Sequence, residues 1–426
     1  MPLLGSIADD FTGATDLCSM LVRNGMRTVQ LIGVPGAAQP APDADAVVVA
    51  LKSRTVPVAQ AVEESLAALA WLRQAGCRQF FFKYCSTFDS TDQGNIGPVG
   101  DALMEALGSG FALACPAFPT NRRTVYQGHL FVGDTLLNES GMEKHPLTPM
   151  TDANLVRVLG RQTRWPVGLV PFATVEKGAA AIRDAMTELK EQGRHWAVVD
   201  AVSDAHLLAI GEAAAAHALI TGGSGVAIGL PENFRRSGLL EALADPGALP
   251  RVEGPAAVVA GSCSRATLQQ IEVARAHVPV LQLDPLATPN SAQLARQATE
   301  WAREWLGAEP VVIAASAPPE RVAALQARLG RDEAGALVEQ ALADVAEALV
   351  ELGVRRLIVA GGETAGAAVG RLKVKSLRIG VEIDPGVPWT YAEGEGVALL
   401  MALKSGNFGA PDFFIKAFTM LEGGGA

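Results

Sequence analysis

Short apolar runs alternate with longer amphipathic segments along most of this chain, and this alternation is the strongest constraint on its fold. Runs that are apolar throughout are typical of strands in a parallel sheet that is covered by helices on both faces. The sequence therefore predicts an α/β fold. The clearest strand-like runs are residues 3–8, 46–51, 80–82, 256–260 and 357–360.

The length of the chain and one linker-like segment predict two domains. At 426 residues the chain is longer than an ordinary single domain. Residues 241–254, EALADPGALPRVEG, carry the Pro and Gly residues that are typical of a linker. We therefore expect domains at residues 1–245 and 255–426, each a mostly parallel sheet flanked by helices, with an active-site cleft between them.

Composition and charge exclude several classes of protein. The net charge of −10 provides no general attraction to nucleic acid or to an anionic membrane, so neither partner is expected. The five cysteines are scattered and include no CxxC pair, which argues against a disulfide framework and a structural zinc site. The sequence starts directly with a strand-like run and has no apolar stretch of membrane-spanning length, so we expect a cytoplasmic protein. The sequence leaves open whether the protein forms a homo-oligomer.

Two adjacent carboxylates, Asp9 and Asp10, follow the first strand-like run and precede a helix expected over residues 12–24. Ligands bind at the carboxyl ends of strands in open α/β sheets, and the N-terminus of the next helix attracts anions. Paired carboxylates at such a place suit a metal ion or a hydroxyl that must lose its proton. Asp10 or Thr12 could instead cap the helix, and one residue can do both.

Two further strand-like runs end in polar side chains, which a parallel sheet would bring to the same edge as the two aspartates. One run leads to Arg54, and the next leads to Lys83 and a stretch of hydroxyls with one carboxylate. For each run alone, an ordinary solvent-exposed loop is the alternative; three runs with the same kind of ending favour a ligand site. Cys85 lies in this stretch, and packing is its expected role because no base is nearby in sequence. The polar residues of the stretch are Ser86, Thr87, Asp89 and Ser90.

The second half of the chain has small residues at two strand ends. Residues 261–264, Gly-Ser-Cys-Ser, and residues 361–364, Gly-Gly-Glu-Thr, each stand between a strand-like run and a helix. Such junctions let a phosphate group approach backbone N–H groups, although capped helices without a ligand are common. Two of these junctions in one domain favour nucleotide binding, but the chain contains no Walker A motif.

Two other segments bear on function. Residues 221–229 are glycine-rich but lack the GxGxxG spacing after a clear strand, which disfavours an NAD-dependent dehydrogenase. We expect a flexible loop there that allows close approach of another group. Residues 116–149 are expected to be largely irregular, with Arg122 and Arg123 available for a substrate carboxylate and His129 either structural or substrate-binding.

A series of motifs resembles the four-carbon acid sugar kinase family. The resemblance covers nearly the whole chain in the same order, and within the family it is closest to the 3-oxo-tetronate 4-kinases. This subfamily assignment depends mainly on residues 85–90, where relatives that act on threonate or erythronate have a shorter Asp-Ser-Thr-Leu-Arg-type stretch. The motifs are IADDFTGATD at residues 7–16, KYCSTFDST with the following GNIGP, YQGHLFVGD, NESGMEKHPLTPM, AGSCS, AGGETAG, EIDPGVPW and SGNFG.

The resemblance implies an N-terminal domain that binds the acid sugar and a C-terminal domain that binds ATP. The implied reaction transfers a phosphoryl group from ATP, with Mg²⁺, to the C4 hydroxyl of 3-oxo-tetronate. Chemistry then suggests that Asp9 or Asp10 accepts the hydroxyl proton, and that Arg54 and Lys83 hold the substrate carboxylate or the migrating phosphoryl group. Metal-binding residues stay unassigned. The implied nucleotide-binding residues are Ser262, Ser264, Gly361, Gly362, Glu363, Thr364 and Gly406. The implied acid-sugar site consists of Asp9, Asp10, Arg54, Lys83 and residues 86–90.

Two alternatives remain. A threonate or erythronate kinase would share most of the motifs, and a non-catalytic two-domain protein that binds a small acid would share the fold. The two phosphate-type junctions disfavour the binding protein. Thermal stabilisation separates the classes, because ATP with Mg²⁺ should stabilise a kinase, NAD a dehydrogenase, and neither a simple sensor.

Overall fold

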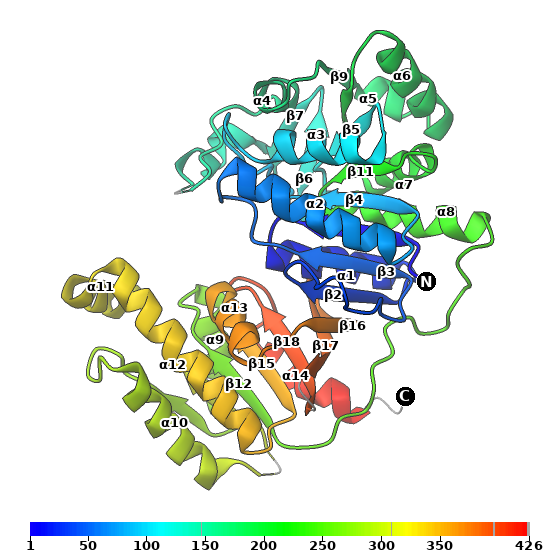
Figure 1. Ribbon diagram of the computed structural model, residues 1–426. Coiled ribbons are helices and arrows are strands. Elements are labelled where there is room, and N and C mark those ends of the chain that lie inside the picture. Colours follow the sequence, from blue (N-terminus) through cyan, green and yellow to red (C-terminus); the bar gives the residue numbers. More distant parts are fainter. Residues whose placement is uncertain (146, 308, 395–396, 424–426) are drawn as a thin grey trace. The chain divides into compact units, whose positions relative to one another are not determined.

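The structure, a computed structural model, describes residues 1–145, 147–307, 309–394 and 397–423. The chain divides into two compact units, Met1–Pro246 and Gly247–Ala426. In each unit helices pack against a sheet that is wholly or mostly parallel (Figure 1). The predicted α/β class is confirmed. No helix within the described ranges combines the length and the apolar character needed to cross a membrane.

The first unit is built on a sheet with the strand order β2-β3-β1-β4-β11-β5-β10-β9, in which the described pairs are parallel. Ala8 at the end of β1 lies opposite Ala50 of β3 and Lys83 of β4, so these three strands end level at one edge. The strands are β1 (Leu4–Ala8), β2 (Thr28–Ile32), β3 (Ala46–Ala50), β4 (Gln79–Lys83), β5 (Ala112–Cys115), β9 (Val167–Val170), β10 (Trp196–Val199) and β11 (Leu219–Gly222).

The path of the chain reverses direction in this sheet between β1 and β4. From β1 the chain passes over β3 to β2, whereas from β3 it passes over β1 to β4. Right-handed crossovers therefore place α1 and α2 on opposite faces, and Figure 1 shows α3 beside α2. The carboxyl ends of β1 and β4 form the topological switch point, where α/β proteins bind ligands. The helices are α1 (Phe11–Arg23), α2 (Val58–Gln74), α3 (Ile96–Leu107), α4 (Leu155–Gln162), α5 (Phe172–Val175), α6 (Ala179–Glu191), α7 (Asp204–Ala213) and α8 (Leu230–Arg236).

The segment at residues 116–149 is more regular than the sequence predicted. It contains a small antiparallel sheet of β6 (Arg123–Tyr126), β7 (His129–Val132) and β8 (Thr135–Leu136). Gln127 and Gly128 both have positive φ, 51° and 72°, as the tight turn of a hairpin requires. The carboxylate of Asp200, just after β10, accepts hydrogen bonds from their N–H groups (2.6 and 2.9 Å). A long-range contact thus fixes a turn that local sequence signals only weakly.

The glycine-rich segment at residues 221–229 is not the flexible loop that was expected. After β11 it forms a largely buried 3-10 helix, Ser224–Gly229. The expected close approach does occur, because a Cβ atom on Gly223 would lie 2.7 Å from the carbonyl oxygen of Pro116. The glycines serve tight internal packing.

The second unit has the strand order β13-β14-β12-β15-β18-β17-β16, parallel as far as β18 and antiparallel beyond it. Trp389 packs in its core and donates from Nε1 to the carbonyl oxygen of Ala417 (3.0 Å). The strands are β12 (Ala256–Ala260), β13 (Val280–Gln282), β14 (Val311–Ala314), β15 (Arg356–Ala360), β16 (Ser376–Asp384), β17 (Val387–Gly394) and β18 (Val397–Lys404).

The second sheet has its own reversal, between β12 and β15. From β12 the chain turns to β13 on one side, and from β14 it passes over β12 to β15 on the other. The helices α10, α12 and α13 pack in a row, while α9 packs with α14 (Figure 1). The predicted small-residue junctions both lie at this second switch point. The helices are α9 (Arg265–Arg275), α10 (Ser291–Trp305), α11 (Pro319–Leu329), α12 (Arg331–Glu351), α13 (Gly362–Arg371) and α14 (Phe413–Gly423).

Candidate active site

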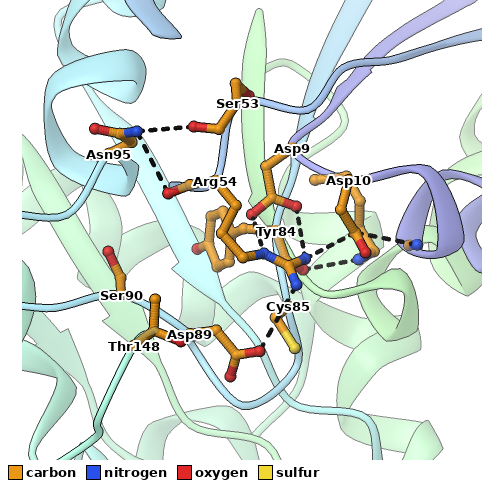
Figure 2. A network of polar contacts seen from close by, with 12 residues as sticks. Asp9, Asp10, Ser53, Arg54, Tyr84, Cys85, Asp89, Ser90, Asn95 and Thr148 are labelled. Atoms are coloured by element: carbon orange, nitrogen blue, oxygen red, sulfur yellow. Dashed lines mark hydrogen bonds and ion pairs between the residues drawn. The ribbon is translucent and has the colours of Figure 1, made fainter. Parts of the chain in front are cut away.

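Arg54 organises a group of carboxylates at the first switch point. Its guanidinium binds both oxygens of Asp9, Nε to Oδ2 and NH2 to Oδ1, each at 2.9 Å. NH2 also lies 2.7 Å from Oδ1 of Asp10, and NH1 lies 3.7 Å from Oδ2 of Asp89 (Figure 2). The structure therefore brings together the endings of β1, β3 and β4, as the sequence predicted.

Backbone hydrogen bonds hold these endings in register. The N–H groups of Ser53 and Arg54 donate to the carbonyl oxygen of Asp9 (3.0 and 3.2 Å), and the N–H of Asp9 donates to the carbonyl oxygen of Lys83 (3.0 Å). The side-chain amide of Asn95 donates to the carbonyl oxygens of Ser53 (2.7 Å) and Arg54 (3.4 Å) (Figure 2). No local sequence pattern marks Asn95 as a site residue, because its partners are distant in sequence.

Asp9 and Asp10 differ in the exposure of their side chains and in how many of their carboxylate oxygens accept hydrogen bonds. Asp9 is almost buried, with 6% of its side chain exposed, and both oxygens are bound by Arg54. Asp10 is 30% exposed, and its Oδ1 caps α1 by accepting from Gly13 N (3.1 Å). Within the described residues no hydrogen bond reaches its Oδ2. Burial and the neighbouring charge of Asp9 raise the pKa of Asp10, against the opposing charges of Arg54 and Lys83.

Lys83 ends β4 beneath the start of α1. It is 2% exposed, and its Nζ donates to the carbonyl oxygen of Tyr84 (2.8 Å). A Cβ atom on Gly13 would lie 2.8 Å from this Nζ, so glycine lets the lysine reach the turn. The charge of Lys83 also acts on Asp16 of α1. Burial raises the pKa of Asp16 above its usual value, and the charges of Lys83 and Arg123 oppose this shift. Asp16 lies in the first motif, but no pattern in the sequence predicts a role for it.

The stretch after β4 contributes Asp89 but not all of its predicted residues. Thr87 Oγ1 donates to Asp89 Oδ1 (2.5 Å), which orients the carboxylate near Arg54. Ser90 lines a small cavity with Asp9 and Asp89, and its Oγ accepts from Gln162 Nε2 (3.0 Å). Ser86 makes no hydrogen bond with any residue that the structure describes. Burial and Asp89 raise the pKa of the Cys85 thiol to about 11, consistent with a packed residue rather than a nucleophile.

The second switch point forms a small-residue cradle, which we define as Ser262, Ser264, Gly361, Thr364 and Gly406. Ser262 N donates to the carbonyl oxygen of Ala360 (3.1 Å), which ties the two junctions together. Ser264 caps α9 by accepting from Thr267 N (3.2 Å) and donates to the carbonyl oxygen of Gly406 (2.5 Å). A Cβ atom on Gly406 would clash with Ser262 Oγ. The N-termini of α9 and α13 meet here, which suits an anionic group.

A cavity of about 680 Å³ extends from the cradle within the second unit. Of the predicted nucleotide-binding residues, Ser262, Gly361, Gly362, Glu363 and Thr364 line it, whereas Ser264 and Gly406 lie behind Ser262. Its far part combines apolar side chains with charged ones, including an ion pair between Arg321 and Asp284 (2.5 Å). The volume is in the range of small-molecule sites. The lining residues that sequence analysis missed include Asp284, Leu286, Arg321, Val322, Leu325 and Arg331.

Comparison with known proteins adds to this geometry. Two family models match the chain, the sugar-binding N-terminal domain over residues 4–230 and the nucleotide-binding C-terminal domain over residues 257–414. A 3-oxo-tetronate kinase of Burkholderia multivorans is 60% identical over 422 residues, 99% of this chain and 98% of that protein. A 3-oxo-tetronate kinase of Cupriavidus necator is 58% identical over 428 residues, again 99% and 98%.

A solved structure from Salmonella typhimurium LT2 matches with a TM-score of 0.91 and 44% identity, and the match covers 98% of this chain and 99% of that one. The sequence motifs, both family models and the full-length relatives agree. The chain belongs to the four-carbon acid sugar kinase family.

Proposed function

We propose that this protein is an ATP-dependent kinase that phosphorylates the C4 hydroxyl of 3-oxo-tetronate, giving 3-oxo-tetronate 4-phosphate and ADP. The observation that carries the proposal is the Arg54-held carboxylate group at the switch point of the sugar-binding unit, in a chain whose second unit has a phosphate-type cradle. The names of the full-length relatives support the substrate.

Asp10 is the better candidate for the base. Its Oδ2 has no hydrogen-bond partner in the described part of the chain, and its raised pKa makes it a stronger proton acceptor than an ordinary aspartate. As the C4 oxygen attacks the γ-phosphorus, its proton passes to Asp10, and the bond from the γ-phosphorus to the β,γ-bridging oxygen breaks to release ADP. Asp9 has both oxygens occupied and serves to hold Arg54 in place.

Arg54 and Lys83 take different roles in this proposal. The Arg54 guanidinium is engaged by three carboxylates, which supports a role in setting their positions rather than in binding the substrate carboxylate. Lys83 is buried beside the cap of α1, where its charge offsets those of Asp10 and Asp16.

The second unit would bind ATP through the cradle and its cavity. Backbone N–H groups at the starts of α9 and α13 and the hydroxyls of the cradle are the donors that phosphate oxygens require. Mg²⁺, when bound, supplies charge neutralisation at the phosphates. The described residues include no cluster of three or more His, Cys, Asp or Glu side chains that could hold a metal ion. The phosphates of ATP would therefore carry the ion, with Glu363 of the cavity lining as an available carboxylate.

The test is ADP release by the purified protein with ATP and Mg²⁺ over a panel of 3-oxo-tetronates, threonate and erythronate. We expect turnover with a 3-oxo-tetronate. Turnover with threonate or erythronate alone would leave a kinase with a different substrate. Absence of turnover with every acid, in protein that binds ATP in a thermal shift assay, would contradict the proposed acid-sugar substrates.

A further inference from the structure

A lysine side chain is completely buried at the end of β18, next to the cradle. Lys404 has no exposed surface, and its backbone carbonyl accepts a hydrogen bond from Gly361 N (2.8 Å). Its Nζ donates to Thr267 Oγ1 (3.0 Å) and to the carbonyl oxygens of Ser405 (3.1 Å) and Gly406 (3.0 Å). Neither the sequence motifs nor the proposed reaction gives Lys404 a role.

These contacts fit the charged form of the side chain. Three acceptors use all three protons of an ammonium group, whereas a neutral amine has only two. Thr267 Oγ1 acts as an acceptor toward Lys404 because its own proton is directed to the carbonyl oxygen of Gly406 (3.0 Å). None of the three acceptors is a carboxylate, so Lys404 is a buried cation without a described counter-ion.

A buried charge without a counter-ion costs free energy. Burial lowers the pKa of Lys404 to about 8, and no charged group on the elements packed against β18 and Lys404, namely α9, α13, β15 and β17, contributes to the shift. Strongly perturbed groups of this kind concentrate at functional sites. The buried charge of Lys404 lies directly behind the cradle. An anionic ligand in the cradle would supply the missing negative charge.

One carbonyl group, that of Gly406, connects Lys404 to the cradle by hydrogen bonds. The Gly406 oxygen accepts from Lys404, from Thr267 and from Ser264 Oγ (2.5 Å). Ser264 in turn caps α9. Gly406 has no Cβ atom that would crowd the Ser264 side chain. Lys404 therefore fixes the position of the hydroxyl-lined edge of the cradle without reaching its surface.

We propose that Lys404 is a positioning residue for the nucleotide, whose buried ammonium group orders the Ser405–Gly406 turn against Ser264 and attracts the phosphates of ATP. This inference rests on the proposed function, because it takes ATP as the ligand of the cradle. Bound phosphates favour the ammonium form, so ATP binding raises the pKa of Lys404 and the protein takes up part of a proton near pH 8.

Isothermal titration calorimetry of the full-length protein tests this proton uptake directly. ATP with Mg²⁺ is titrated without an acid substrate, at pH 8 and at pH 6.5, in two buffers with different ionisation enthalpies. We expect the wild type to take up a fraction of a proton at pH 8 and almost none at pH 6.5, where Lys404 is already protonated. A purely structural lysine would show no such uptake.

The matched variants are Lys404→Met and Lys375→Met, since Lys375 is an exposed lysine of the same unit. K404M should bind ATP on the order of 30-fold more weakly and take up no proton at pH 8. The KM for the acid substrate should stay unchanged, because the variant alters only the nucleotide side. K375M should behave as the wild type.

The outcomes separate this inference from the proposed function. ATP binding by the wild type without proton uptake at pH 8 overturns the inference and leaves the kinase proposal intact. Failure of the wild type to bind ATP overturns both. If K404M does not fold, the comparison of buffers and pH values on the wild type decides the question alone.

Discussion

Asp9 and Arg54 form a two-pronged ion pair in which each carboxylate oxygen receives one hydrogen bond of 2.9 Å from the guanidinium group. Arg54 is only 22% exposed and Asp9 only 6%, so neither charge is well solvated. In such a pair each partner depends on the other, because removing one leaves a buried charge without compensation. The position of Asp10 follows from the same guanidinium group.

Replacing Arg54 with Met should abolish turnover and lower the free energy of unfolding by about 3–5 kcal/mol, because Asp9 is left buried and unpaired. Urea denaturation gives the stability. The double variant D9N/R54M should recover part of the lost stability but no activity. Arg251→Met, which removes an exposed ion pair with Glu253 (3.5 Å), serves as the control and should change the stability little. An R54M protein as stable as the wild type would show that the ion pair contributes nothing.

Replacing Asp10 with Asn should reduce kcat by about 10²- to 10⁴-fold, because the amide cannot accept the hydroxyl proton. Asn also caps helices well, so the thermal stability should change little. Steady-state kinetics and calorimetric binding of both substrates separate the loss of chemistry from a loss of binding. Full turnover by D10N with normal substrate affinity would exclude Asp10 as the base.

The pH profile of the wild-type kinase should show the raised pKa of Asp10. The base must be ionised, so kcat falls as the pH drops through the pKa of Asp10 in the enzyme complex. Burial and Asp9 raise this value above the ordinary 3.8, so the acidic limb should lie at higher pH than for an unperturbed aspartate. The limb should be absent from the residual activity of D10N. An identical limb in both proteins would assign it to another group.

Replacing Gly406 with Ala should weaken ATP binding, because the added methyl group would collide with Ser262 Oγ and push the cradle apart. The Kd for ATP, measured by calorimetry, should rise while the KM for the acid stays the same. Gly370→Ala is the control, since no atom lies within 4 Å of its added Cβ atom and it lies on α13. That control should keep its ATP affinity and gain roughly 0.5–1 kcal/mol of stability from helix propensity.

Unfolding at alkaline pH should reveal the buried charge of Lys404 in the protein without ATP. Its pKa is about 8 in the folded state and 10.5 in an ordinary environment. Between these values the unfolded chain binds more protons than the folded protein. The free energy of unfolding of the wild type minus that of K404M should therefore increase with pH, by at most about 1.4 kcal/mol per unit. Below pH 8 the difference should be constant. A difference that decreases through this window would contradict the assignment.

Much of the fold could be predicted from local sequence. Apolar runs such as residues 46–51 and 256–260 identify strands because both faces of a parallel sheet are buried, and polar residues directly after them mark the predicted ligand edge. Asp10 was also recognisable as a helix cap. These features depend on residues that are close together in the chain, so periodicity and spacing record them.

The parts that sequence could not predict depend on long-range contacts. The hairpin at Gln127 is held by Asp200, and Asn95 acts on the carbonyl oxygens of a different loop. Lys404 resembles an ordinary lysine at a strand end until its three acceptors are located. The charged far wall of the cavity, with Arg321 and Asp284, combines separate segments of the second unit. In each case at least one decisive partner, such as Thr267 for Lys404, is too far away in sequence to leave a local pattern.

The cap that Asp10 places on α1 makes the amide of Gly13 a spectroscopic reporter. This amide donates to Oδ1 of Asp10, so its hydrogen bond weakens when the carboxylate takes up a proton at Oδ2. The ¹H and ¹⁵N chemical shifts of Gly13 should therefore follow the ionisation of Asp10 as the pH changes, with no substrate present. A nuclear magnetic resonance titration of one glycine could then measure, in the resting protein, the proton affinity on which the proposed chemistry depends.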